Sequence, residues 1–306
     1  MSERQQNIMA SIHARLANKA RESGKPFGEI LQYYGIERFL YRLSQTRHLD
    51  DLILKGGLVF YSMGIPLRRL TRDIDFLGLM KNQKETITRV IQDTISVSVP
   101  EDGVKFDPAS LLVEFTQIGA DREGIRANFV GYLDRARIPI QIDFGFSDEM
   151  IFEATTIKFP VLLEGMAGLQ IKSYAVQSVV AEKFHAIQRY ADIPSRWKDY
   201  YDIWLISGNF VIDDQALQNA IIKTFENRAT RLPYGRPLSM TVEFAFKYRE
   251  NWRTFLRKSG LESDDTNDLA QIIEKIWLFL EWPLGLTAFD VQGDHRQWIP
   301  GEGWHL

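Results

Sequence analysis

The spacing of apolar residues predicts that the chain begins with helices. Apolar positions recur at helical spacing over 3–22 and 27–47, and the Ser23-Gly24-Lys25-Pro26 break separates the two segments. A further helix is predicted over 83–97, followed by a polar loop over 100–108. We expect the apolar faces of these helices to pack into a core.

Alternating apolar and polar residues predict a β-rich segment in the middle of the chain. The strands are expected at 111–117, 125–133 and 138–146, with a weaker one at 152–158. Short links, such as the one at 134–137, favour antiparallel hairpins.

A strand–helix–strand unit is predicted over residues 52–80. A short apolar strand ends at Lys55-Gly56-Gly57, and a helix, a turn at Gly64-Ile65-Pro66 and a basic link follow it. The second strand carries Asp73-Ile74-Asp75. Because side chains alternate along a strand, we expect Asp73 and Asp75 to share one face, with Ile74 directed into the core.

Helical periodicity dominates the rest of the chain, which ends in a tail containing Trp and Gly. The expected helices cover 174–190, 197–207, 213–227, 239–258 and 267–282. We therefore predict two domains, with α+β structure in 1–160 and a helical domain in 161–306.

Composition excludes several classes of protein. The 306 residues are 45% hydrophobic and 25% charged, which is ordinary for a globular chain. No apolar run approaches the roughly 20 residues of a membrane helix, and the polar N-terminal segment does not resemble a signal peptide. Cysteine is absent, which excludes disulfides and thiolate chemistry, and we expect a cytoplasmic protein. The five histidines form no ligand-like pair, which argues against a structural metal.

The net charge of −3 and the isoelectric point near 6.0 give no global basic footprint for nucleic acid. Any nucleic-acid site must therefore be a local patch, and two arginine clusters are candidates: Arg68, Arg69 and Arg72, and Arg228, Arg231 and Arg236. Such charges are usually solvated surface residues.

The aspartates of the strand–helix–strand unit have the chemistry of a metal site. Two carboxylates on one face of an apolar strand repel each other unless a cation lies between them, and Mg²⁺, or Mn²⁺ in its place, suits such ligands. Gly56 and Gly57 would let backbone N–H groups approach a phosphate. Together these features favour phosphoryl or nucleotidyl transfer. The alternatives are a solvated strand edge and an ordinary turn.

A third acidic residue is predicted beside the first two. On the strand at 138–146 the apolar positions place Asp143 on the non-core face, where it would complete a two-metal site. Asp148, in the loop after that strand, is expected to begin a turn.

Lys183 falls in the middle of the apolar stripe of the 174–190 helix. A lysine there is costly unless it meets a carboxylate, a phosphate or solvent, so we expect it to contact the phosphates of a nucleotide, with a snorkelling lysine as the alternative. On the next helix Asp199 and Asp202 are neighbours on one face, and periodicity alone predicts that both are exposed.

Four ordered blocks of residues resemble the AbiEii/AbiGii toxin family over roughly residues 30–207. The blocks are Lys55-Gly56-Gly57, Arg69-x-Thr71-x-Asp73-Ile74-Asp75-Phe76, Ala181-Glu182-Lys183-x-x-Ala186 and Arg196-x-Lys198-Asp199-x-x-Asp202. The resemblance implies a nucleotidyltransferase core with a mixed sheet, of the polymerase-β superfamily, followed by a helical domain. It also implies a toxin of an abortive-infection or toxin–antitoxin system, with a separately encoded antitoxin and, in some members, transfer from an NTP to the 3′ end of tRNA.

The resemblance, together with the strand position of Asp143, gives each predicted site residue a role. Asp73 and Asp75 would bind Mg²⁺, and Asp143 would help to deprotonate the acceptor. Lys183 would contact phosphate, and Asp202, with Asp199 as second choice, would be the late acidic residue of the site. The residues expected to contact the nucleotide are Lys55, Gly56, Gly57, Arg72, Lys183 and Asp199.

The chain departs from the superfamily at Gly57-Leu58, where Gly-Ser is usual, so a serine contact to phosphate is missing. Asp143 fits by its place on a strand and not by a strict motif. Two alternatives stay open: transfer to a small molecule on the same fold, and a non-catalytic protein that binds a nucleotide or a partner.

Overall fold

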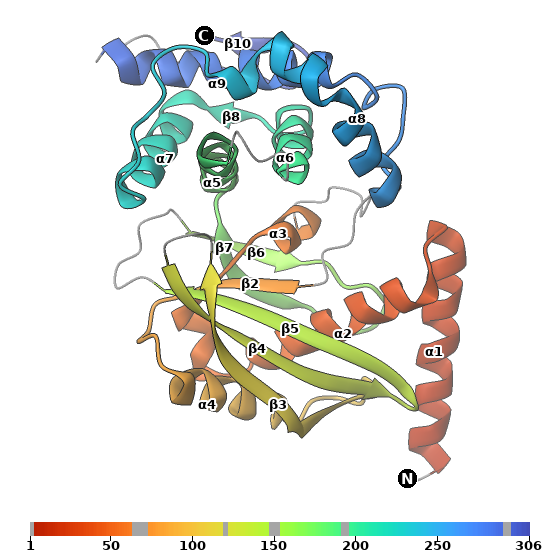
Figure 1. The fold of residues 1–306 in the computed structure, drawn as a ribbon. Helices are drawn as coiled ribbons and strands as arrows, with labels where there is room; N and C mark the ends of the chain where they lie inside the picture. Colours follow the sequence, from red (N-terminus) through yellow and green to blue (C-terminus); the bar gives the residue numbers. More distant parts are fainter. Residues whose placement is uncertain (1–2, 63–72, 119–121, 147–153, 191–195, 290–294) are drawn as a thin grey trace. The chain divides into compact units, whose positions relative to one another are not determined.

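A computed structural model describes residues 3–62, 73–118, 122–146, 154–190, 196–289 and 295–306 (Figure 1). It divides into two compact units, Met1–Tyr174 and Ala175–Leu306. Among the residues described, no helix is long and apolar enough to cross a membrane. The turn at Gly64, the cluster around Arg69 and the loop residue Asp148 lie outside them.

A seven-stranded mixed sheet forms the centre of the first unit, in the order β3-β4-β5-β2-β1-β7-β6. Its strands are β1 (Leu52–Lys55), β2 (Asp73–Gly78), β3 (Val104–Ile118), β4 (Arg122–Leu133), β5 (Ala136–Phe146), β6 (Ala154–Phe159) and β7 (Leu169–Tyr174). β2 runs parallel to β5 and antiparallel to β1, and β1 runs parallel to β7. The predicted α+β class with a mixed sheet is confirmed.

Helices α2 and α4 cover one face of the sheet at strands β3–β5 (Figure 1). The helices of this unit are α1 (Glu3–Ser23), α2 (Phe27–Leu43), the 3-10 helix η1 (Arg47–Asp51), α3 (Gly57–Ser62) and α4 (Lys84–Ile95). Phe39 of α2 lies 5.4 Å from the ring of Phe129 on β4. Alternate β5 residues are buried beneath the helices, as the apolar pattern predicts.

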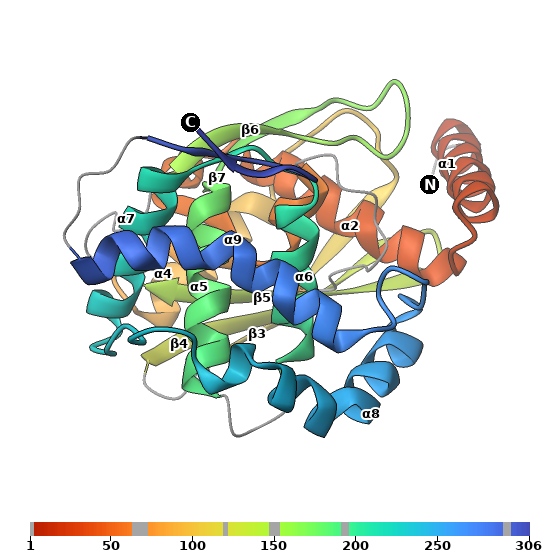
Figure 2. The same cartoon turned by 90° about the horizontal axis from the view of Figure 1, so that it is seen from above.

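The second unit is mainly helical and carries a small three-stranded sheet. Its elements are α5 (Val176–Arg189), α6 (Trp197–Ser207), β8 (Ile212–Asp213), α7 (Asp214–Asn227), η2 (Leu238–Met240), α8 (Val242–Ser259), α9 (Leu269–Phe289), β9 (Gln297–Ile299) and β10 (Gly303–His305). Helix α9 lies across α6 and α7, and α8 packs beside it (Figure 2).

Four details differ from the sequence prediction. The expected loop over 100–108 contains the start of β3 at Val104, and the first domain extends past residue 160 because β7 pairs with both β1 and β6. Helix α9 continues through Pro283 to Phe289, although proline removes a helix hydrogen bond. The Trp-containing tail forms β9 and β10, and Trp298 donates a 2.6 Å hydrogen bond to the carbonyl of Ser207.

The contact between α2 and β5 leads to a stability prediction. A Cβ added at Gly35 would lie 2.5 Å from Cγ2 of Ile138. Gly35→Ala should therefore destabilise the protein by about 1–3 kcal/mol, despite the better helix propensity of alanine. In the same helix, a Cβ added at Gly28 would have no atom within 4 Å, so Gly28→Ala should be neutral or slightly stabilising. Urea unfolding of both variants checks this, and equal effects would contradict the packing argument.

Candidate active site

Two aspartates from neighbouring parallel strands lie side by side on one face of the sheet. In the register of β2 and β5, Asp75 is opposite Asp143, and Asp73 is opposite Gln141. Ile74, between the two β2 aspartates, is fully buried, whereas Asp73, Asp75 and Asp143 are half-buried. The predicted alternation is confirmed, and the three carboxylates gather on the non-core face.

Arg126 of β4 holds the third carboxylate in place. It is opposite Asp143 in the register of β4 and β5, and its Nε and Nη2 donate hydrogen bonds of 2.7 and 2.9 Å to the two carboxylate oxygens. The hydrogen bond to Asp143 raises the pKa of Arg126, and the charges of Asp143, Asp73 and Asp75 add to this effect. Arg126 therefore offsets the repulsion among the three carboxylates.

Arg126 is not among the residues predicted for the site, although the sequence contains a signal for it. The hairpin between β4 and β5 closes on a two-residue turn, with Leu133 opposite Ala136. Counting back along both strands from that turn places Arg126 opposite Asp143.

Gly56 fits tightly against the second aspartate. Its φ is +70°, and a Cβ at this position would lie 2.1 Å from Oδ2 of Asp75. Lys55 is opposite Asp75 in the register of β1 and β2, and α3 begins at Gly57. Only glycine satisfies both the backbone conformation and the close approach. The structure thus brings Lys55, Gly56 and Asp75 together, while Arg72 lies outside the described residues.

The predicted residues of the second unit form a separate buried cluster. Lys183 Nζ on α5 donates hydrogen bonds of 3.1 Å to Asp199 and 2.5 Å to Asp202 on α6. Asp199 and Asp202 are only 7% and 5% exposed, so the prediction of exposed acids was wrong. Their helix is buried on more than its aromatic stripe, because α5 packs against it.

The position of Lys183 on the core-facing stripe is confirmed, since the residue is 8% exposed. Burial alone would lower the pKa of its ammonium group, but the charges of Asp202 and Asp199 outweigh burial and raise it. Lys183 therefore remains charged at physiological pH. The snorkelling alternative does not fit, because the charged end meets carboxylates inside the protein.

One further acidic group has the spacing of a metal site. Ligand atoms of Asp213, Asp214 and His295 lie within 4.8 Å of one another. The carboxylate of Asp213 accepts a 2.8 Å hydrogen bond from the backbone of Ala216, and that of Asp214 accepts one of 2.9 Å from Trp282. The Asp213 carboxylate thus caps the N-terminus of α7, and the Asp214 carboxylate holds Trp282 of α9.

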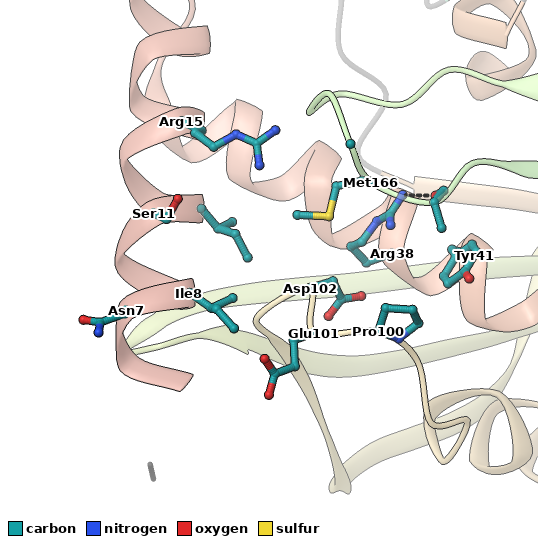
Figure 3. Close-up of a pocket in the computed structure, with 13 residues that line it drawn as sticks. Asn7, Ile8, Ser11, Arg15, Arg38, Tyr41, Pro100, Glu101, Asp102 and Met166 are labelled. Carbon is teal, nitrogen blue, oxygen red and sulfur yellow. Dashed lines mark hydrogen bonds between the residues drawn. The ribbon is translucent and has the colours of Figure 1, made fainter. Parts of the chain in front are cut away.

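A cavity of about 710 Å³ lies between α1 and α2 (Figure 3). Its lining includes Arg15, Arg38, Asp102 and Met166. Arg38 is buried and donates a 3.1 Å hydrogen bond to the carbonyl of Ala167. Of the predicted site residues that the structure describes, none lines this cavity.

Comparison with known proteins identifies a family. The model of the nucleotidyl transferase AbiEii toxin, type IV toxin–antitoxin system, matches residues 38–279. JHP933 from Helicobacter pylori is a similar solved structure, with a TM-score of 0.47 and 11% identity over 86% of this chain and 98% of its own. A second, described as a candidate nucleotidyltransferase from H. pylori, has a TM-score of 0.44 and 12% identity over 96% of this chain and all of its own. No curated protein matches the chain.

The buried cluster of the second unit leads to a prediction about stability. Lys183→Met leaves Asp202 buried without its cation and Asp199 with only the partly exposed Arg196 at 3.8 Å, which should cost about 3–5 kcal/mol in urea unfolding. The triple variant Lys183→Met/Asp199→Asn/Asp202→Asn should be clearly less destabilised, because no charge stays uncompensated. Lys223→Met on the exposed side of α7 is the control and should change stability by less than about 0.5 kcal/mol.

The pH dependence of the same variant follows from the raised pKa of Lys183. A raised pKa gives stability that is fully present below the ordinary pKa and is lost as the pH rises from that value through the raised pKa. The difference between Lys183→Met and the wild type should therefore be constant between about pH 7 and 9. A Lys183→Met protein as stable as the wild type would show that the cluster contributes nothing.

Proposed function

Because this chain belongs to the nucleotidyl transferase AbiEii toxin family, we propose that it transfers a nucleoside monophosphate from an NTP to an acceptor hydroxyl, as on a tRNA. The observation that carries this proposal is the register of β2 and β5, which sets Asp75 beside Asp143 with Asp73 on the same face. Membership in a type IV toxin–antitoxin family also supports a cognate antitoxin as partner and a toxin acting in the cytoplasm, where NTPs and tRNA are found. A role in abortive infection is part of the same proposal.

The donor set of the site suits Mg²⁺, or Mn²⁺ in its place. Asp73, Asp75 and Asp143 offer carboxylate oxygens from adjacent strands, all on a face that solvent reaches. Hard divalent cations bind few carboxylates and fill their remaining positions with water and phosphate oxygens. When bound, such a cation would neutralise charge on the phosphates and on the leaving pyrophosphate.

In the proposed reaction, the acceptor oxygen attacks the α-phosphorus of the NTP. The bond from the α-phosphorus to the oxygen that bridges to the β-phosphate breaks, and pyrophosphate leaves. Asp143 takes the proton of the acceptor hydroxyl, and Arg126 orients its carboxylate for that transfer. The turn at Gly56 and Gly57 has no side chain that would keep phosphate oxygens from the backbone N–H groups, and Lys55 adds positive charge beside it.

For Lys183 we propose a positioning role in place of direct phosphate contact. Both of its carboxylate partners lie within hydrogen-bonding distance of its ammonium group, which burial also separates from solvent. Lys183, Asp199 and Asp202 would then fix α5 against α6, so that the helical unit keeps one shape during turnover.

Transfer is tested with each of four α-labelled NTPs, total tRNA and Mg²⁺. The expected result is label in the RNA together with release of unlabelled pyrophosphate. Label on a small molecule of an added metabolite extract would favour the other acceptor class. Failure of all four NTPs to bind in calorimetry would contradict the proposed function and favour a non-catalytic protein.

The carboxylates themselves provide a sharper prediction. Asp75→Asn and Asp143→Asn should each lower transfer at least about 100-fold, because metal and proton assistance are worth several kcal/mol. Glu123→Gln, exposed on β4, is the matched control and should keep wild-type activity. Initial rates and thermal unfolding of all three proteins check this, and an active, folded Asp75→Asn protein would contradict the assignment.

Gly56→Ala tests the close approach of the glycine to the aspartate. The added Cβ would displace the Asp75 carboxylate, so we expect loss of transfer together with weaker metal-dependent NTP binding in calorimetry. Gly165→Ala is the control, because Gly165 has a similar φ of +78° and a Cβ added there would have no atom within 4 Å. Both substitutions should cost about 1–2 kcal/mol of backbone strain, but only Gly56→Ala should lose activity. Equal activities would show that the contact is dispensable.

A further inference from the structure

The outer face of β3–β5, opposite α2 and α4, continues from the carboxylates as a strip of polar and aromatic side chains. The register sets Asn128 beside Gln141, and Gln141 beside Asp73. At the far end Tyr132 is opposite both Lys105 and Arg137. We call the following residues the outer strip: Lys105, Leu112, Arg126, Asn128, Tyr132, Arg137 and Gln141.

Solvent reaches this strip. Lys105 and Arg137 are exposed, Leu112 is 53% exposed and Tyr132 is 36% exposed. The residues between them in sequence, such as Ile138 and Phe129, are buried on the other face. Arg137 and Asp143 are six residues apart on β5, so the strip is about 20 Å long at about 3.3 Å per residue.

A cavity of about 640 Å³ joins the strip to the carboxylates. It is lined by Asp73, Asn128 and Gln141 at one end and by Arg137 at the other. Gln32 of α2 forms part of its wall and donates a 2.5 Å hydrogen bond to the carbonyl of Pro139, where β5 extends past the start of β2. The cavity thus extends from Arg137 to Asp73, one of the three carboxylates of the proposed catalytic site.

We propose that the outer strip binds the single-stranded 3′ end of an RNA acceptor, whose terminal hydroxyl reaches Asp143. This inference rests on the proposed function. The side chains match the occupant: Lys105 and Arg137 suit phosphates, and Tyr132 offers a ring on which a base stacks. The amides of Asn128 and Gln141 hydrogen-bond base edges in the cavity.

The strip leads away from the carboxylates on the side from which an in-line attack on the α-phosphorus would come. Gly56 contacts Asp75 from the β1 side, and the strip leaves the carboxylates on the β5 side. A nucleotide held at Gly56 and Gly57 would carry its pyrophosphate towards β1. The attacking hydroxyl must then come from the opposite side, where the strip lies.

The arginine cluster of the second unit is a weaker candidate for the same RNA. Arg228 lies 3.5 Å from Glu182, and Arg236 lies 2.5 Å from Glu274. Those carboxylates already compensate the positive charges of Arg228 and Arg236, so the cluster attracts phosphates less strongly. In the outer strip Lys105 and Arg137 flank the ring of Tyr132, and the two acids of this face, Asp107 and Glu114, are opposite Val130 and Arg126.

Salt dependence of RNA binding tests the two cations. Binding of labelled total tRNA is measured by fluorescence at several salt concentrations for the wild type and for Lys105→Ala/Arg137→Ala. Each lost phosphate contact lowers the slope of log K against log salt by about 0.7, so the double variant should lose about 1.4. The control Arg47→Ala/Lys158→Ala removes two other exposed cations of the same unit and should keep the wild-type slope.

Stacking is tested at Tyr132. Tyr132→Phe keeps the ring and should bind tRNA like the wild type, whereas Tyr132→Leu should bind about tenfold more weakly. Equal affinity of both variants, an unchanged salt slope in Lys105→Ala/Arg137→Ala, or no binding of tRNA by the wild type would each overturn the inference.

The nucleotidyltransferase function and RNA binding by the outer strip can be tested separately. Calorimetry with NTP and Mg²⁺ should give wild-type affinity for Lys105→Ala/Arg137→Ala and for both Tyr132 variants, because none of these three residues contacts the nucleotide or the carboxylates in the proposal. Normal transfer to tRNA by Lys105→Ala/Arg137→Ala would overturn the strip and leave the function intact. Absence of NTP binding and transfer in the wild type would overturn the function, and tRNA binding would still test the strip directly.

Discussion

The first unit depends on one constraint, which is that two like charges stand next to each other on adjacent parallel strands. Asp75 and Asp143 share a position in the register, and their repulsion is tolerated only because the surroundings compensate it. Arg126 occupies the next strand at the same level, and Gly56 leaves the space that the Asp75 carboxylate takes. The buried residues on the other face, Ile74 among them, fix the strands in this register.

Much of this arrangement was predictable from the sequence because strands have a period of two. Alternation alone placed Asp73, Asp75 and Asp143 on the outer face. It did not show that β2 and β5 are neighbours, because strand order depends on contacts between distant segments. β7 was missed for a similar reason: its residues alternate only over Leu169–Tyr174, and its pairing with β1 joins strands far apart in sequence.

Charged residues buried on helices were harder to predict. A helical wheel shows the apolar side of one helix but not which other faces a neighbouring helix covers. It therefore placed Asp199 and Asp202 in solvent, although both meet Lys183 in the interior. The wheel marked Lys183 as anomalous because a charge on an apolar stripe needs a partner. Combining that need with the nearest acidic face would have found the cluster.

The two units solve the same electrostatic problem in ways that suit different tasks. In the second unit a lysine lies between two aspartates and all three are buried, and the remaining negative charge is met by the partly exposed Arg196, 3.8 Å from Asp199. In the first unit Arg126 and Asp143 stay partly exposed, at 40% and 15% of their side-chain surface. A buried ion cluster maintains structure, whereas carboxylates that solvent reaches can also bind a cation and a substrate. We therefore assign the proposed chemistry to the outer face of β2 and β5, because the charges there are exposed and not because they are more numerous.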